Sequence, residues 1–136
     1  MSKSNATETA ILSYIFTAVA PSWAAATDLD IHLHTADPGE AGTSATSEAT
    51  YTSYAAVTVA RNATDWTVSG NTVTNDNLIQ FPQCTGGSNT ITHVSITPAG
   101  DTTILYSGAL NSPLAVSNGI QPQFAGGGSA LAITED

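Results

Sequence analysis

The sequence predicts a mainly β protein: an antiparallel β-sandwich or jelly roll of about seven or eight strands, with one short helix near the N-terminus. Short apolar–polar alternations recur along the chain, and turn-forming runs such as DPG (37–39) and NG (118–119) separate them. One run of good helix formers precedes these alternations. Because 136 residues suit a single core, we expect an N-terminal arm and helix over 1–22 and one β-sandwich domain over 23–136.

The helix is expected over 6–16 (ATETAILSYIF). Asn5 is the candidate N-cap, and Glu8 follows three residues later, as in a capping box. Pro21 sets the end of the helix near Val19, because the residue before a proline avoids helical geometry.

The apolar residues of this helix need a partner. Ile11, Tyr14 and Ile15 share one helical face, so the helix packs either on its own sandwich or on a neighbouring protein. The apolar run at 11–20 is interpreted as part of the mature protein, because Glu8 precedes it and a membrane span needs about 20 apolar residues.

Alternation and turn signals then predict the strands in order. They are expected at 28–34, 51–60, two short runs within 65–74, 77–82, 90–99, 102–110 and 129–135. The longest polar break, at 36–50, is expected to be a mobile loop. Frequent threonine favours the pleated surface of a strand over a helix.

The charge balance limits the partners. The net charge is −9, and Lys3 and Arg61 are the two basic residues, which argues against nucleic acid and against an anionic membrane surface. Charged residues make up 10% of the chain, compared with a usual value of about 25%. Such a surface suits a protein whose surface is mostly covered by partners or by copies of itself. The lone cysteine, Cys84, is interpreted as a buried apolar residue.

The strand DLDIHLH (28–34) is the strongest candidate for a chemical site. On a strand, Asp28, Asp30, His32 and His34 share one face, opposite Leu29, Ile31 and Leu33. The His-x-His spacing is similar to that of the metal-binding cupins, with Glu40 as a further ligand and His93 as a distant one. Because Glu40 follows a turn, the favoured interpretation is a polar strand face that is solvated or turned toward an interface, without metal or cofactor.

The remaining candidate sites are interpreted as parts of the fold rather than as sites of chemistry. The carboxylate pair Asp28 and Asp30 is expected on the same polar face, and the glycines at 126–128 are expected to form a flexible hairpin turn. Trp23 and Trp66 are either a sugar-stacking platform or core and interface anchors, with the second interpretation favoured. No catalytic residue is assigned, and the chain is not expected to be an enzyme.

A series of short motifs resembles a family of small tailed-phage virion proteins, variously called head-decoration, cement or tail-fibre proteins. The phrase HLHTADPGEAG (32–42) is the most specific of them. The remaining matches follow in order at 54–57, 65–66, 79–82, 91–96, 104–110 and 130–134. The resemblance implies a β-sandwich that sits on a virion and does no catalysis.

The leading hypothesis is therefore a capsid decoration protein on the outer surface of the phage head, made in the host cytoplasm. Its partners would be the major capsid protein and copies of itself, as a dimer or trimer. The helix residues 11–16 are the candidate docking element. The alternative is a tail-fibre or receptor-binding module, with Trp23, Tyr51, Tyr54 or Trp66 facing a ligand.

Overall fold

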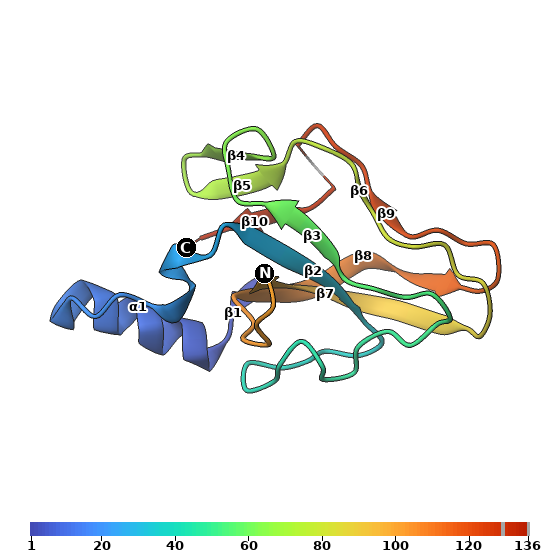
Figure 1. Cartoon of the computed structure of the whole chain (residues 1–136), viewed down its shortest axis with the longest axis horizontal. Coiled ribbons are helices and arrows are strands. Elements are labelled where there is room, and N and C mark those ends of the chain that lie inside the picture. Colours follow the sequence, from blue (N-terminus) through green and yellow to red (C-terminus); the bar gives the residue numbers. More distant parts are fainter. Residues whose placement is uncertain (129, 136) are drawn as a thin grey trace.

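A computed structural model describes residues 1–128 and 130–135 and shows antiparallel sheets with one projecting helix (Figure 1). The largest sheet has five strands in the order β1-β8-β7-β2-β3, and all its pairs are antiparallel. Its members are β1 (Ser2–Lys3), β2 (Asp28–His34), β3 (Val57–Ala60), β7 (Asn89–Pro98) and β8 (Tyr106–Val116).

Two smaller sheets lie against this one. The first has the order β10-β5-β4, and the second pairs β6 with β9. Their bounds are β4 (Trp66–Ser69), β5 (Thr72–Asn75), β6 (Ile79–Gln80), β9 (Gln123–Phe124) and β10 (Ala132–Thr134). The main core lies between the sheets, where side chains from all of them form one buried cluster; these include Ile31, Leu33, Trp66, Phe81, Ile96 and Ile133. This confirms the mainly β, antiparallel fold class, and the strand order is compatible with a jelly roll.

Helix α1 (Asn5–Thr17) leaves the sheets and extends away from them (Figure 1). Its N-cap is Ser4, whose hydroxyl accepts a hydrogen bond from the Thr7 amide, so the cap lies one residue before the predicted Asn5. Ala18 ends the helix in the left-handed conformation, at φ 55°. The chain then returns to the sheets through a short 3-10 helix, η1 (Ser22–Ala25).

Several strand boundaries differ from the prediction. The strand expected over 51–60 is confined to β3, because residues 51–56 belong to the loop between β2 and β3. Strands β1 and β9 were missed, since each has two residues and too short an alternation to recognise. Strand β8 runs to residue 116 through a register shift against β7, which places Pro113 where the ladder is interrupted.

The segment between β2 and β3, residues 35–56, is called the covering loop below. It is held by backbone hydrogen bonds: Ala49 N–H donates to the Leu33 carbonyl at 2.8 Å, and Ser44 N–H donates to the Thr102 carbonyl at 3.0 Å. The Asn89 side chain accepts from the amides of Thr50 and Tyr51. The expectation of a mobile loop was therefore wrong, because the loop is tied both to β2 and to the end of the sheet beyond it.

Candidate functional site

The two histidines of β2 lie in the interior. His34 is 0% exposed and His32 is 8% exposed. The expectation that this strand face is solvated, or turned toward an interface, was wrong for both residues. The alternation itself is correct, since Ile31 and Leu33 enter the main core on the opposite face. A polar strand face is buried here because a second layer, the covering loop, lies over it.

Both ring nitrogens of His34 are engaged. Nδ1 donates to the Thr46 carbonyl at 2.8 Å, which leaves Nε2 of the neutral ring to accept from the Ser95 hydroxyl at 2.7 Å. Burial lowers the pKa of His34 below its usual 6.5, while the bond to the Thr46 carbonyl opposes this effect. His34 is therefore held as a neutral, structural imidazole.

The neighbouring His32 joins a short polar network. Its Nδ1 lies 2.7 Å from Oε1 of Glu48, and its Nε2 lies 3.1 Å from the Thr97 hydroxyl. The same Glu48 oxygen accepts from the Tyr54 hydroxyl at 3.0 Å, and that hydroxyl accepts from the Leu33 amide. Burial raises the pKa of the Tyr54 phenol well above its usual value. The network joins the covering loop to β2.

The other candidate metal ligands do not complete a site. His93 lies directly opposite His34 in the β2–β7 register, but its Nδ1 lies 2.8 Å from the Thr92 hydroxyl. Glu40 is exposed in a turn, and it shares a shallow hollow with His93. Within residues 1–128 and 130–135, no group of three His, Cys, Asp or Glu side chains has the arrangement of a metal site.

The paired carboxylates are also structural. Asp30 accepts from the Thr58 hydroxyl at 2.6 Å and from the Gly100 amide at 3.0 Å, so it joins β2 to β3 and to the turn after β7. Asp28 accepts from the adjacent Thr27 hydroxyl.

Residues 126–128 form a packed turn. The amides of Gly127 and Gly128 donate to the carbonyls of Asp76 and Asn75. A Cβ on Gly126 would lie 2.5 Å from the Asp76 carbonyl oxygen, so a glycine is required there for close packing. The two amides are already committed to backbone partners and are not arranged to hold a phosphate.

Three of the four aromatic candidates lie in the core. Tyr51 is 3% exposed, and its hydroxyl donates to the Pro82 carbonyl. The Tyr54 ring stacks on Phe81, and the Trp66 Nε1–H donates to the Ala60 carbonyl. The alternative in which Tyr51 and Tyr54 face a ligand is therefore wrong. Trp66 is a core residue, as favoured, and its indole also forms part of the wall of the groove described next.

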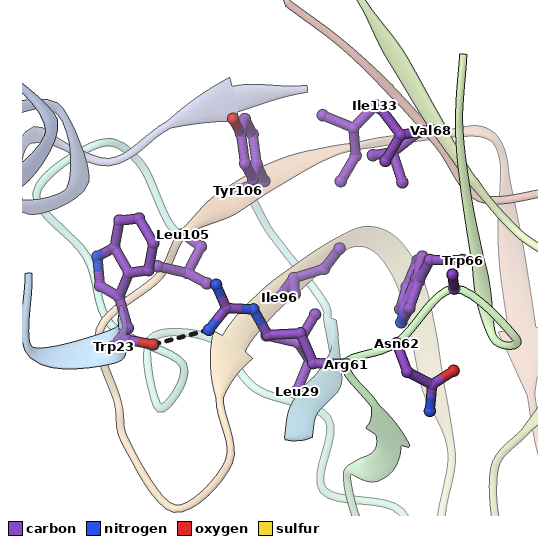
Figure 2. A pocket seen from close by; sticks show the side chains of 12 residues that line it. Trp23, Leu29, Arg61, Asn62, Trp66, Val68, Ile96, Leu105, Tyr106 and Ile133 are labelled. Carbon is purple, nitrogen blue, oxygen red and sulfur yellow. Dashed lines mark hydrogen bonds between the residues drawn. The ribbon is translucent and has the colours of Figure 1, made fainter. Parts of the chain in front are cut away.

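Trp23, the fourth aromatic candidate, lines an apolar groove of about 520 Å³ (Figure 2). The groove opens where the five-stranded sheet meets β4, β5 and β10. Trp23 and Leu105 lie at one side of it, and Trp66 and Val68 lie at the other (Figure 2). Arg61 stands 5.8 Å from the centre of the Trp23 ring and donates to the Trp23 carbonyl.

The second exposed apolar feature is the helical projection, defined as residues 5–21. Its large side chains are turned to solvent: Leu12, Tyr14, Ile15, Phe16 and Val19 are 57–78% exposed. The projection contacts the sheets mainly through its first turn, where Ser4 and Thr7 donate to the Ile104 carbonyl. Of the two interpretations left open by the sequence, packing on its own sandwich is excluded.

Sequence reasoning missed most of the groove. Leu105 and Tyr106, at the start of β8, lie far along the chain from Val68 in β4, and nothing in the alternation of either strand indicates that they meet. The two basic residues lie near this groove, and Lys3 is ion-paired there with Glu135. Lys3 stands 5.8 Å from the ring of Tyr106, and Arg61 is part of the lining.

The profile of a family described as Podophage GP4 fiber I protein gp80 matches residues 2–132. The chain belongs to this family. The gp80 family is one of phage structural proteins, which confirms the resemblance to small tailed-phage virion proteins. Comparison with curated proteins found no match.

Within residues 1–128 and 130–135, no helix has both the length and the apolar character needed to cross a bilayer.

Proposed function

We propose that this protein is a non-catalytic structural subunit of a tailed-phage virion and that it forms part of a fibre. The observation that carries this proposal is the match over residues 2–132 to a family described as a podophage fibre protein. The imidazoles of His32 and His34 hold the covering loop to the sheet, so the residues that were candidates for chemistry serve the fold instead. On this proposal, the surfaces available for contact with other virion proteins are the exposed apolar projection and the groove.

A second candidate is capsid decoration, in which the protein binds the major capsid protein at the outer surface of the head. Two observations favour it. The sheets form a compact body with no long shaft (Figure 1), and a surface with few charges suits close contact with a shell. Affinity would come from a modest contact repeated many times, so a weak single contact would be sufficient.

Imaging of purified virions separates the two candidates. A fibre subunit is expected in few copies, at discrete projections, and its antibody label should cluster there. A decoration protein is expected in many copies over the shell. Absence of the chain from purified particles would overturn both proposals.

Particles lacking the protein provide an independent measurement. A fibre role predicts that heads keep their resistance to heat and chelator while adsorption to the host changes. A decoration role predicts that heads release DNA at lower temperature, with adsorption unchanged. If both properties were unchanged, a structural role in the virion would be refuted.

A further inference from the structure

The middle of the covering loop, residues 43–48, is held to the sheets mainly by polar contacts. This segment is called the clasp below. Its Ser44 amide donates to the Thr102 carbonyl, in the turn between β7 and β8, at 3.0 Å. No side chain of the clasp, which the structure describes in full, belongs to the buried apolar cluster, whereas Ala49 and Tyr51 just after it do. Segments with little buried apolar area open locally at a lower free-energy cost than the whole domain.

The backbone of the clasp is strained at Ser47. Its φ of 54° lies in the left-handed region, which is unfavourable for a residue with a Cβ. The residues on either side of it contact the two imidazoles of β2. The Thr46 carbonyl accepts from Nδ1 of His34 at 2.8 Å, and Oε1 of Glu48 lies 2.7 Å from Nδ1 of His32. The imidazoles therefore hold a strained residue in place, and weakening their contacts favours release of the segment.

No charged group is hydrogen-bonded to His34. The side chain is fully buried, and its two partners, the Thr46 carbonyl and the Ser95 hydroxyl, are neutral. A proton taken up while the clasp is closed would therefore place a charge in the interior without a bonded counter-charge, which is costly. Opening the clasp admits water to the ring and removes this cost.

Three titratable groups face His34, one from each element around it: His32 on β2, His93 on β7 and Glu48 on the covering loop. Burial is the largest cause of the lowered pKa of His34; the two imidazoles lower it further, and Glu48 and the Thr46 carbonyl raise it. The Glu48 side chain is 28% exposed and already engaged by His32, so solvent screens its attraction for a charge on His34.

Protonation of His32 acts in the opposite direction, because a charged His32 is attracted more strongly to Glu48. A partly exposed ion pair of this kind contributes little to stability. An unpaired charge on the fully buried His34 costs more. The net effect of acid is therefore to favour opening.

We propose that the clasp is an acid-sensitive device: when His34 takes up a proton, residues 43–48 detach from β2 and from the turn between β7 and β8, while the sheets stay folded. The opened form binds the proton more readily than the closed form, so opening increases as the pH falls below about 6.5. Because most residues of the clasp are exposed, acid changes one face of the protein without unfolding it. This holds whether the protein sits on a fibre or on the head.

Amide hydrogen exchange of the full chain, resolved by NMR at pH 7.5 and 5.5 and corrected for the intrinsic exchange rate, tests the proposal. The reporters are the amides of Ser44 and Thr35, which donate to the Thr102 and Ser47 carbonyls. Both should have a larger opening constant than the amides of β7 at either pH. The opening constant should rise by up to about tenfold at pH 5.5, because opening takes up at most one proton.

The chain has three histidines, so substitution assigns the cause. His34→Gln has no titrating ring and should lose the rise at pH 5.5. If that variant does not fold, His32→Gln and His93→Gln assign the cause by elimination, since each should keep at least the wild-type rise.

A pair of glycine variants tests the strain. Ser47→Gly adopts the same φ without cost, so it should slow exchange of both reporters at both pH values and leave their ratio unchanged. The matched control is Ser53→Gly, at φ 81° in the same loop but outside the clasp, which should leave the reporters unchanged.

Three outcomes would overturn the proposal. The first is reporter exchange no faster than that of β7, which would mean that the clasp opens only when the whole protein unfolds. The second is an opening constant that does not rise between pH 7.5 and 5.5. The third is a rise that persists in His34→Gln or disappears in His32→Gln or His93→Gln.

Discussion

Two regions of this molecule invert the usual arrangement of polar and apolar residues. Under the covering loop, two histidines lie inside the protein, and one of them is bonded to the partly exposed Glu48. In the helical projection, large apolar side chains lie outside it. The buried polar groups are stable because each has a hydrogen-bond partner in the same chain. The exposed apolar side chains are not satisfied in this way, because apolar surface is removed from water only when another apolar surface packs against it. The polar groups of the first region are satisfied within the chain, whereas the large apolar side chains of the second remain exposed in the described structure.

The largest expected effect on the free energy of unfolding comes from removing a buried histidine under the covering loop. His34→Ala removes a fully buried side chain and leaves the Ser95 hydroxyl and the Thr46 carbonyl without partners. We expect a loss of about 3 kcal/mol in the free energy of unfolding. Urea denaturation measures it. The matched control is His93→Ala, which removes a partly exposed imidazole on the same face and should cost about 1 kcal/mol or less. Equal losses in both variants would contradict the structural role of His34.

Removing the carboxylate of the covering loop should cost less. Glu48→Ala deprives His32 and the Tyr54 hydroxyl of a shared acceptor, and the expected loss is about 2 kcal/mol. Glu40→Ala changes an exposed glutamate of the same loop and should stay within about 0.5 kcal/mol of the wild type. Limited proteolysis should also cut residues 35–56 faster in the Glu48 variant. If the Glu48 variant kept its stability and its loop were cut no faster than in the wild type, the hydrogen bonds of Glu48 would not be what holds the loop.

Lowering the pH should reduce the part of the free energy of unfolding that depends on neutral His34. Because the folded-state pKa of His34 lies below its unfolded value of 6.5, the unfolded chain binds a proton more readily as the pH falls. The contribution of neutral His34 to stability is complete above pH 6.5 and is lost as the pH falls toward the folded pKa. One such group changes stability by at most about 1.4 kcal/mol per pH unit.

Urea denaturation of the wild type and His34→Gln between pH 7.5 and 5.5 measures this dependence. The decline with falling pH should be smaller in the variant. Identical slopes in the two proteins would show that His34 does not cause the decline.

The smallest effect is expected in the exposed region. Leu12→Gln, on the projection, should change the free energy of unfolding by less than about 0.5 kcal/mol when copies are dilute enough to be separate. A loss above about 2 kcal/mol in dilute solution would mean that the projection packs on its own sheets after all.

Local patterns in the sequence were sufficient for much of the fold. Strand β2 was predicted with its observed bounds, because seven strictly alternating residues followed by Asp37-Pro38-Gly39 leave little choice. Gly39 has φ 71°, and its amide donates to the Asp37 carboxylate, as a turn at that place requires. The hairpin of β4 and β5 and the strand β7 were also predicted within one residue. These elements depend on neighbours along the chain, and their sequences carry the information.

The burial of the strand faces was not predictable in the same way. Alternation shows that His32 and Leu33 face opposite sides, but it does not show what lies over each side. Ser95 and Thr97, which hold the two imidazoles, are more than 60 residues away in the sequence. The groove was not predictable for the same reason, since Trp23 of η1, Val68 of β4 and Leu105, which precedes β8, meet only when distant segments come together.

The sequence by itself determined the mainly β class, the helix, the turns and the likeness to a phage virion family, because each depends on periodicity or on motifs read along one stretch of chain. Only the tertiary structure decided that the histidines of β2 are buried and neutral, that the covering loop seals them, and that helix α1 remains uncovered. Burial depends on which distant segments are brought together. That is set by the packing of the whole chain rather than by any local pattern.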